Sequence, residues 1–301
     1  IRDRGMIWGV MALGVYITFR LLDFADLTVD GSIATGAAVS VMLIRAGVSP
    51  IATLPIAFLA GALAGMVTGL LNTALGIPGI LASILTQISL YSINLNIMGK
   101  ANQPVSVDNY PLVVSLRYVT DGSVSRLLFF LGMIVFLLAL IAVMYWYFGT
   151  EQGHAIRATG CNGNMARAQG INTNFIKVLA LMISNGLVGL CGALYGQFQG
   201  ASDVNMGRGA IVIGLAAVII GEAVFGRIFH NFALKMVSVS LGAIIYYIVI
   251  QLVLTLGFDA NLLKLLSASV VAVFLAVPYW KGRYFAKPAA KKANKEGANN
   301  A

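Results

Sequence analysis

The sequence predicts an all-α polytopic membrane protein with about nine transmembrane helices and a short helix on the cytoplasmic side. Hydrophobic residues make up 59% of the 301 residues and charged residues only 10%, whereas soluble domains average roughly 45–50% and 25%. A transmembrane helix needs about 20 mostly apolar residues to cross about 30 Å of hydrocarbon, and such stretches follow one another along the chain. This composition excludes a soluble globular protein.

Nine apolar stretches, separated by glycine, proline and charged residues, are the predicted spans. They cover residues 5–22, 31–46, 51–74, 79–98, 127–148, 174–198, 208–226, 231–256 and 261–280. Together they predict one transmembrane domain over residues 1–280. Residues 281–301 are rich in lysine and alanine and poor in large apolar side chains, which predicts a basic, disordered cytoplasmic tail.

Basic residues predict the orientation of the chain, because lysine and arginine accumulate in cytoplasmic loops. The tail carries a net charge of +5 out of the overall +9, since it holds six Lys and Arg residues and one Glu. Arg157 and Arg167 lie in one polar loop, and Arg227 lies in a short turn. These segments share the cytoplasmic side if four spans separate the polar loop from the tail. An odd number of spans then places the N-terminus outside, where Arg2 and Arg4 are less favourable.

Glycines recur at helical spacing in two spans, at Gly61, Gly65 and Gly69 and at residues 192, 196 and 200. Small residues four apart let helix backbones approach closely, which predicts tight packing within the subunit or across a dimer axis. Glycine is also simply frequent in membrane spans, so a single pair has little weight. The two triplets together favour packing without choosing the partner.

An acidic segment, residues 21–37, lies between the first two apolar stretches. Asp30, Gly31 and Ser32 are typical of a helix start, because their polar groups can satisfy free backbone N–H groups. One interpretation is a solvated loop with an N-cap. The other is a helix break at membrane depth that lines a cavity, with Arg20 and Asp23 as a neutralising pair. The second interpretation makes residues of this segment candidates for the translocation path: Asp26, Thr28, Asp30 and Ser32.

Glu222 is a further candidate for the path, because an ionisable residue inside a span is often functional. It is placed to pair with Arg227 or to face a cavity. Its position near the cytoplasmic end also allows its carboxylate to reach the interface without any special role.

A second polar segment, residues 149–173, is the longest on the predicted cytoplasmic side. Glycines at 153, 160, 163 and 170 divide it into very short helical pieces. Asn162 or Asn164 can cap a helix over residues 165–169, and Gly170 is placed to end it. A short helix outside the membrane with apolar and basic residues suits docking, although composition does not separate a protein partner from a lipid partner. The alternative is an amphipathic loop that touches lipid headgroups through Arg157 and Arg167.

Three runs of sequence resemble the permease subunits of bacterial ABC importers of the branched-chain amino acid class. They are DFADLTVDGSIATGAA at 23–38, GHAIRATGCNGNMARAQGIN at 153–172 and GLAAVIIGEAVFG at 214–226. The likeness covers nearly the whole chain, and LDFADLTVDGS is closest to a subgroup associated with amino acids, including aromatic ones. Glu222 departs from the pattern, because related permeases more often have small residues there.

The resemblance implies a permease subunit of a binding-protein-dependent ABC importer in the bacterial inner membrane. It implies a small polar solute, with an amino acid as the expected substrate. The implied partners are a second copy of the permease, two cytoplasmic ATPase subunits, an extracytoplasmic binding protein and membrane lipids. It also implies that the polar segment 149–173 holds a coupling helix, which transmits ATPase movements to the membrane domain. The same resemblance implies that this coupling segment contacts the ATPase through these residues: His154, Ala155, Ile156, Arg157, Ala158, Thr159, Asn162, Met165, Ala166, Arg167 and Gly170.

The sequence predicts no enzyme and no cofactor of its own. It lacks a P-loop, so ATP and Mg²⁺ are expected on a partner ATPase, and it lacks H-E-x-x-H and G-x-S-x-G motifs. The two histidines lie in different loops, the two cysteines fit no metal pattern, and nothing points to nucleic acid. We therefore expect no catalytic residues and no metal site. The alternative function is an ion-coupled secondary transporter or channel that acts without an ATPase.

Overall fold

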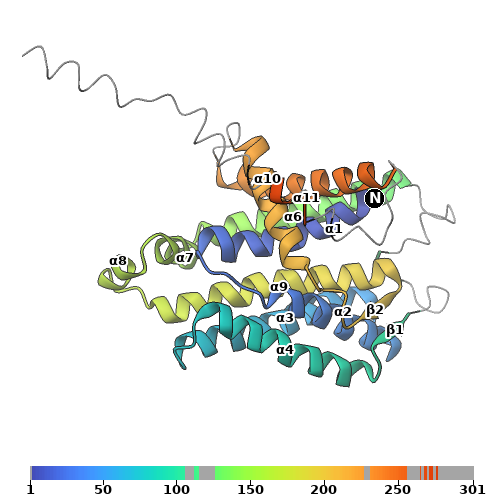
Figure 1. Ribbon diagram of the computed structural model, residues 1–301, viewed down its shortest axis with the longest axis horizontal. Coiled ribbons are helices and arrows are strands. Elements are labelled where there is room, and N and C mark those ends of the chain that lie inside the picture. Colours follow the sequence, from blue (N-terminus) through green and yellow to red (C-terminus); the bar gives the residue numbers. More distant parts are fainter. Residues whose placement is uncertain are drawn as a thin grey trace, which may run out of the picture.

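The computed structural model describes residues 2–105, 112–114, 126–226 and 231–255, together with seven single positions between 265 and 276. Within these ranges the chain is a bundle of long helices with one short two-stranded ribbon (Figure 1). The ninth predicted span lies largely outside the described residues, and the predicted tail lies wholly outside them.

The helices follow the predicted apolar stretches closely. In chain order they are α1 (Arg2–Tyr16), the π-helical turn η1 (Ile17–Leu21), α2 (Val29–Arg45), α3 (Pro50–Thr73), α4 (Gly79–Met98), α6 (Arg126–Phe148), α7 (Glu151–Cys161), α8 (Gly163–Ala168), α9 (Thr173–Gln199), α10 (Ala210–Phe225) and α11 (Phe232–Thr255). Five of them are long and apolar enough to cross a membrane, namely α3, α4, α6, α9 and α11, and α10 is a shorter apolar helix. The all-α polytopic fold is confirmed, while the number of nine spans is not.

The bundle has two distinct ends. The pair α7 and α8 lies at one end, which we call the α8 end, and the start of α1 lies at the other (Figure 1). Strand β1 (Asn102–Pro104) pairs antiparallel with β2 (Ala201–Asp203) at this second end, which we call the ribbon end. The strands tie the connection after α4 to the connection after α9.

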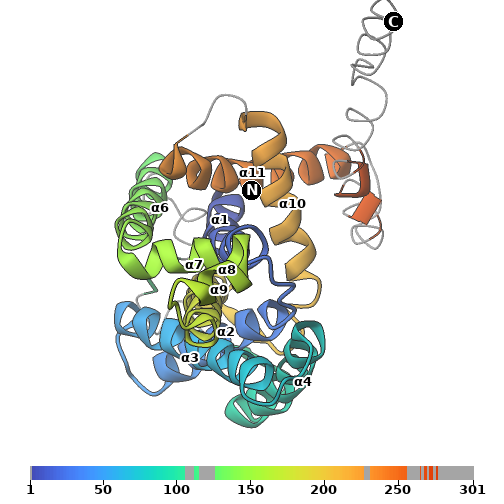
Figure 2. The same ribbon diagram turned by 90° about the vertical axis from the view of Figure 1, so that its left-hand side faces the viewer.

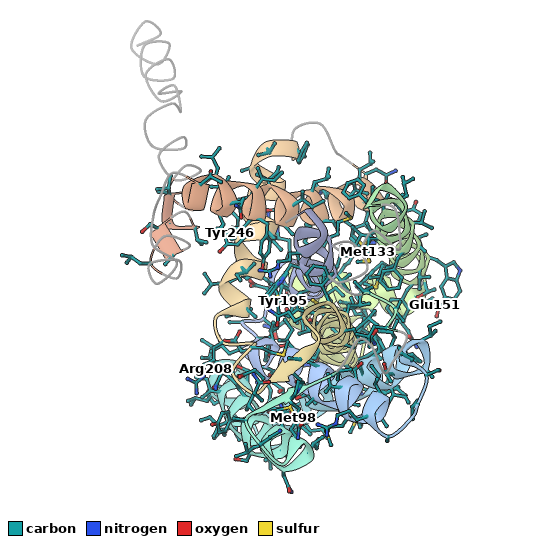
Figure 3. All side chains as sticks on the ribbon, turned by 90° about the vertical axis from the view of Figure 1, so that its right-hand side faces the viewer. Met98, Met133, Glu151, Tyr195, Arg208 and Tyr246 are labelled. Carbon is teal, nitrogen blue, oxygen red and sulfur yellow. The ribbon has the colours of Figure 1, made fainter. Side chains whose placement is uncertain are left out.

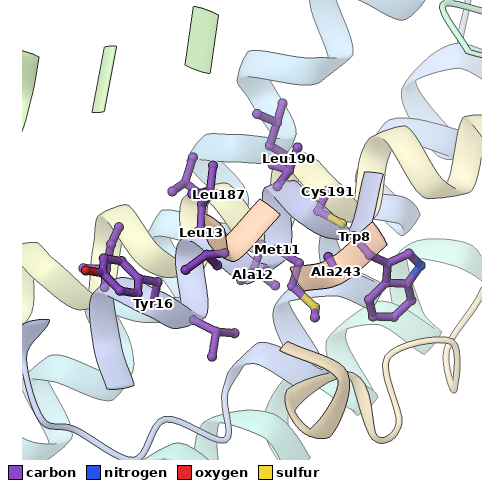
Figure 4. Close-up of a cluster of buried hydrophobic side chains, with 14 of the residues drawn as sticks. Trp8, Met11, Ala12, Leu13, Tyr16, Leu187, Leu190, Cys191 and Ala243 are labelled. Carbon is purple, nitrogen blue, oxygen red and sulfur yellow. The ribbon is translucent and has the colours of Figure 1, made fainter. Parts of the chain in front are cut away.

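Helix α9 is the axis of the molecule, and most of its side chains are buried. Seen from the α8 end, α2, α3 and α4 lie on one side of it and α6, α10 and α11 on the other (Figure 2). Buried side chains of α1 fill the space between α9 and α11 (Figure 4). Trp8 packs edge-on against Tyr195 with ring centroids 5.5 Å apart. The Cys191 thiol is buried and contacts the Ile7 carbonyl, so it is a structural residue.

Glycines make the close contacts of α9 possible. A Cβ on Gly61 or Gly65 of α3 would overlap the backbone carbonyls of Asn185 or Leu181 in α9. Of the second triplet, Gly192 and Gly196 pack against α2, whereas the residue at 200 has φ +71° and ends α9. Five of these six glycines therefore pack against other helices of the same subunit, which was one of the two predicted alternatives.

Candidate functional site

Helical structure is interrupted between η1 and α2, over residues 22–28, and we call this non-helical segment the break. Asp23 lies exposed with φ +53°. Arg20 does not pair with Asp23 as expected, because its Nε donates to Oε1 of Glu222 in α10 at 2.9 Å. The predicted partner of Glu222, Arg227, lies outside the described residues. The ion pair instead connects the end of η1 to α10 near the α8 end.

Asp26 is the most deeply buried acidic residue of the break, with 3% exposure. Its Oδ1 accepts from the Thr28 backbone N–H at 2.9 Å, and its Oδ2 accepts from Nδ2 of Asn185 at 2.6 Å. Oδ1 of Asn185 in turn accepts from the Ser32 hydroxyl at 2.6 Å. Asn185 lies about 18 Å along α9 from the start of that helix, at 1.5 Å per residue. The break is therefore inside the bundle, where irregular backbone needs protein or water partners.

Hydroxyl groups extend this buried network across the next helices. The Thr28 and Thr68 hydroxyls lie 2.7 Å apart, and Thr68 donates to Thr86 at 2.9 Å. These contacts join the start of α2 to α3 and α4. Asp26, Thr28 and Ser32, all predicted for the translocation path, thus lie in the packed interior and hold the broken helix in place.

Asp30 has a different role from the one its position next to Gly31 suggested. Helix α2 begins at Val29, and Asp26 rather than Asp30 accepts from the Thr28 N–H at its N-cap. The Asp30 carboxylate instead accepts from the backbone N–H groups of Gly209 at 3.0 Å and Ile211 at 2.9 Å. These groups open α10, whose positive dipole end favours a carboxylate. Asp30 therefore binds the start of α10 to α2.

Helix α7 is a single helix of eleven residues and not the set of fragments predicted from its glycines. Gly153 and Gly160 lie inside it because they allow close approach of the Phe148 backbone and the Leu21 carbonyl, respectively. Helix α8 begins two residues before the predicted start at Met165, and Asn162 caps it by accepting from the N–H groups of the second and third residues. Gly170 follows its end with φ +84°.

The predicted coupling residues divide into an inward group, whose members are buried or half-buried, and an exposed group. Ile156, Thr159 and Ala166 are buried, Ala155 and Ala158 are half-buried, and the exposed members are His154, Asn162, Met165, Arg167 and Gly170. The Met165 side chain is 62% exposed. It is the largest apolar side chain that the α7–α8 pair offers to a partner.

Arg157 belongs to the inward group. Its guanidinium lies over the Phe232 ring of α11, 3.8 Å from the centroid, and donates to the Phe148 carbonyl of α6 at 3.2 Å. The charge therefore anchors α7 to two spans and is not offered to a partner. Sequence reasoning missed this contact because Phe232 is 75 positions away, and it could not assign a partner to Asn185 because an amide within a span has many possible partners.

Comparisons with known proteins cover almost the whole chain. Residues 3–277 match the family model described as "Branched-chain amino acid transport system / permease component". The chain is 38% identical over 276 residues to the tyrosine transport system permease protein of Clostridioides difficile, covering 92% of this chain and 89% of the relative. It is 26% identical to the inner membrane ABC transporter permease protein YjfF of Escherichia coli, over 71% of this chain and 63% of the relative. It is also similar to the autoinducer 2 import system permease protein LsrC of Yersinia pseudotuberculosis, at 30% identity over 64% of this chain and 52% of the relative. No solved structure matches the chain.

Proposed function

Because the chain belongs to the family of permease components of branched-chain amino acid transport systems, we propose that it is the membrane-spanning subunit of a binding-protein-dependent ABC importer for an amino acid. It acts in the bacterial inner membrane with two cytoplasmic ATPase subunits, an extracytoplasmic binding protein and a second copy of itself. The ATPases bind ATP and Mg²⁺, and this chain forms the path. The tyrosine transport system permease among its relatives supports an aromatic amino acid as one substrate.

The observation that carries the proposal is the α7–α8 pair. It lies outside the long apolar helices, projects from one end of the bundle (Figure 1) and exposes the apolar Met165. A soluble ATPase needs such a rigid protrusion, because a flexible loop would not transmit a movement into the membrane. We therefore assign α8, with the exposed end of α7, to the ATPase contact, and the α8 end to the cytoplasm.

The contacts of α7 suggest how a movement at α8 reaches the path. Arg157 fixes α7 to α6 and α11, and Gly160 packs on the Leu21 carbonyl where η1 ends. The broken segment begins immediately after this contact. A displacement of α7 by the ATPases would therefore act directly on the break and, through Arg20 and Glu222, on α10.

The remaining assignments follow from this orientation. The ribbon end faces the binding protein, and residues 281–301 form a basic tail on the cytoplasmic side near anionic lipid. Residues 1–280 form one permease domain that includes the coupling segment 149–173. Proteolysis of sealed inside-out vesicles should remove the tail, and protection of the tail there would contradict the orientation.

An affinity pull-down of the tagged chain from mild detergent tests the proposal. We expect a P-loop ATPase to be recovered with the chain. Met165→Asp should lower that recovery about tenfold or more, because it places a charge in an apolar contact. Asn102→Asp at the ribbon end is the matched control and should leave recovery unchanged. Equal recovery with both variants, or a chain that repeatedly purifies without an ATPase, would contradict the assignment.

A further inference from the structure

We propose that a cavity between α2, α4 and the connection into α10 is a binding subsite for the charged backbone of a zwitterionic α-amino acid. The inference rests on the proposed function and adds the place where the amino acid binds and the residues that recognise it. The cavity has a volume of about 320 Å³, at the lower end of the roughly 300–1,000 Å³ of small-molecule sites. Its walls include Asp30, Ala34, Gln87, Tyr91, Asn94 and Arg208.

Two opposite charges lie in the walls of this cavity without pairing with each other. Asp30 is half-buried and fixed by the Gly209 and Ile211 N–H groups. A carboxylate has about four acceptor positions, and the backbone N–H groups at the start of α10 do not use all of them. Arg208 is exposed, and its guanidinium has no hydrogen bond or ion pair with any residue that the structure describes. An ammonium group suits Asp30, and a carboxylate suits the planar donors of Arg208.

Asn94 supplies an independent indication of a ligand. Its side chain is 1% exposed, and within the described part of the chain neither its Oδ1 nor its Nδ2 has a hydrogen-bond partner. Buried amide groups are expensive to leave unpaired. Ser83 and Thr86, the other buried polar residues of α4, both have partners. The unpaired amide lines the cavity that holds the two charges.

The position of the cavity fits a path for a polar solute. Helix α4 is the least apolar of the five long spans, and its exposed surface carries Ser89, Ser92 and Asn96. Such side chains are better accommodated beside water or protein than beside lipid. Figure 3 shows Arg208 where the connection into α10 lies beside α4. The cavity lies toward the ribbon end, the side on which we place the binding protein.

The other wall residues indicate the side chain of the amino acid. Ile88 and Tyr91 of α4, with Ala34 of α2, form an apolar and aromatic part of the lining. A large apolar or aromatic side chain fits this part, while the charged backbone lies between Asp30 and Arg208.

Cysteine protection in the assembled importer tests the subsite. Ser92 is exposed and lines the cavity, so Ser92→Cys is introduced in a Cys161→Ser chain, in which the remaining Cys191 is buried. The thiol is modified with a charged methanethiosulfonate in membrane vesicles. L-Tyrosine or L-leucine should slow the reaction. Amines without the carboxylate, tyramine and isopentylamine, should protect about tenfold or more weakly, because one charged hydrogen-bonded contact is lost.

Substitutions at Asn94 and Arg208 separate ligand recognition from a structural role. Asn94→Leu should weaken protection about tenfold, whereas the matched control Asn96→Leu, two residues further along α4 and outside the cavity lining, should not. Arg208→Gln should abolish the preference for the amino acid over the amine, and Arg208→Lys should keep part of it. A structural defect would weaken protection by both ligands equally.

Several outcomes would overturn the subsite. They are a Ser92→Cys thiol that does not react with the charged reagent, protection by neither amino acid, equal protection by the amines, and equal effects of the Asn94 and Asn96 variants. Recovery of the ATPase is measured on the same preparation. An ATPase-containing complex without protection refutes the subsite and leaves the proposed function intact. Protection without any ATPase supports the subsite and contradicts the proposed function.

Discussion

Asn185→Leu should destabilise the protein strongly, although Asn and Leu have similar sizes. Asn185 joins Ser32 and Asp26 from the centre of α9, and it also donates to the Leu181 carbonyl. Leucine leaves the buried Asp26 carboxylate with the Thr28 N–H alone among these partners and deprives the Ser32 hydroxyl of its acceptor. A lost hydrogen bond to a charged group costs about 1.5–3 kcal/mol, and an unsatisfied buried group about 1–3 kcal/mol. We therefore expect a loss of about 3–5 kcal/mol.

Equilibrium unfolding in mixed micelles, followed by far-ultraviolet circular dichroism, measures this loss. The control Asn96→Leu changes an exposed amide of α4 and should stay within about 0.5 kcal/mol of the parent. Adding Asp26→Asn to Asn185→Leu should recover part of the stability, because it removes the charge that lost its partner. A loss below about 1 kcal/mol for Asn185→Leu, or no recovery in the double variant, would refute the argument that this network fixes the break.

Three further substitutions test other contacts. Gly65→Val should cost at least about 1–3 kcal/mol, because its Cβ would meet the α9 backbone, whereas Gly132→Val has open space around it; a thermal unfolding series that ranks them equally would contradict the packing. Arg157→Gln should lower stability by up to about 2 kcal/mol through the lost aromatic contact and increase proteolysis of α7; unchanged digestion would show that the anchor is unimportant. Glu222→Gln should change the free energy of unfolding by less than about 1 kcal/mol, since the side chains of Glu222 and Arg20 are 32% and 58% exposed, and a larger change would assign the pair a structural role.

The sequence predicted the helices well because hydropathy depends on local composition. The bounds of α3, α6 and α9 differ from the predicted stretches by at most one residue, and those of α4 coincide with them. Helix α7 was missed because a glycine inside a polar segment resembles a helix breaker. Its glycines instead serve close contacts with Phe148 and Leu21, which only the three-dimensional arrangement reveals.

The candidate site was predicted less completely, since its chemistry depends on long-range pairs. The acidic segment was singled out correctly as unusual, but the roles of its carboxylates were not separable. Asp26 is satisfied by an amide 159 positions away, and Asp30 by the start of a helix about 180 positions away. Arg208 lies in a segment with no distinctive pattern, and it became a candidate only when the fold placed it with Asn94 around one cavity.

ATP-driven uptake into proteoliposomes tests the central claim most directly. The chain is reconstituted with its co-purified ATPase and binding protein, and entry of radiolabelled L-tyrosine and L-leucine is followed with ATP supplied on the α8 side. The proposed function predicts uptake that requires ATP and the ATPase and that Met165→Asp abolishes. Uptake by the chain alone, driven by an ion gradient and indifferent to ATP and to Met165→Asp, would contradict the claim and establish a secondary transporter.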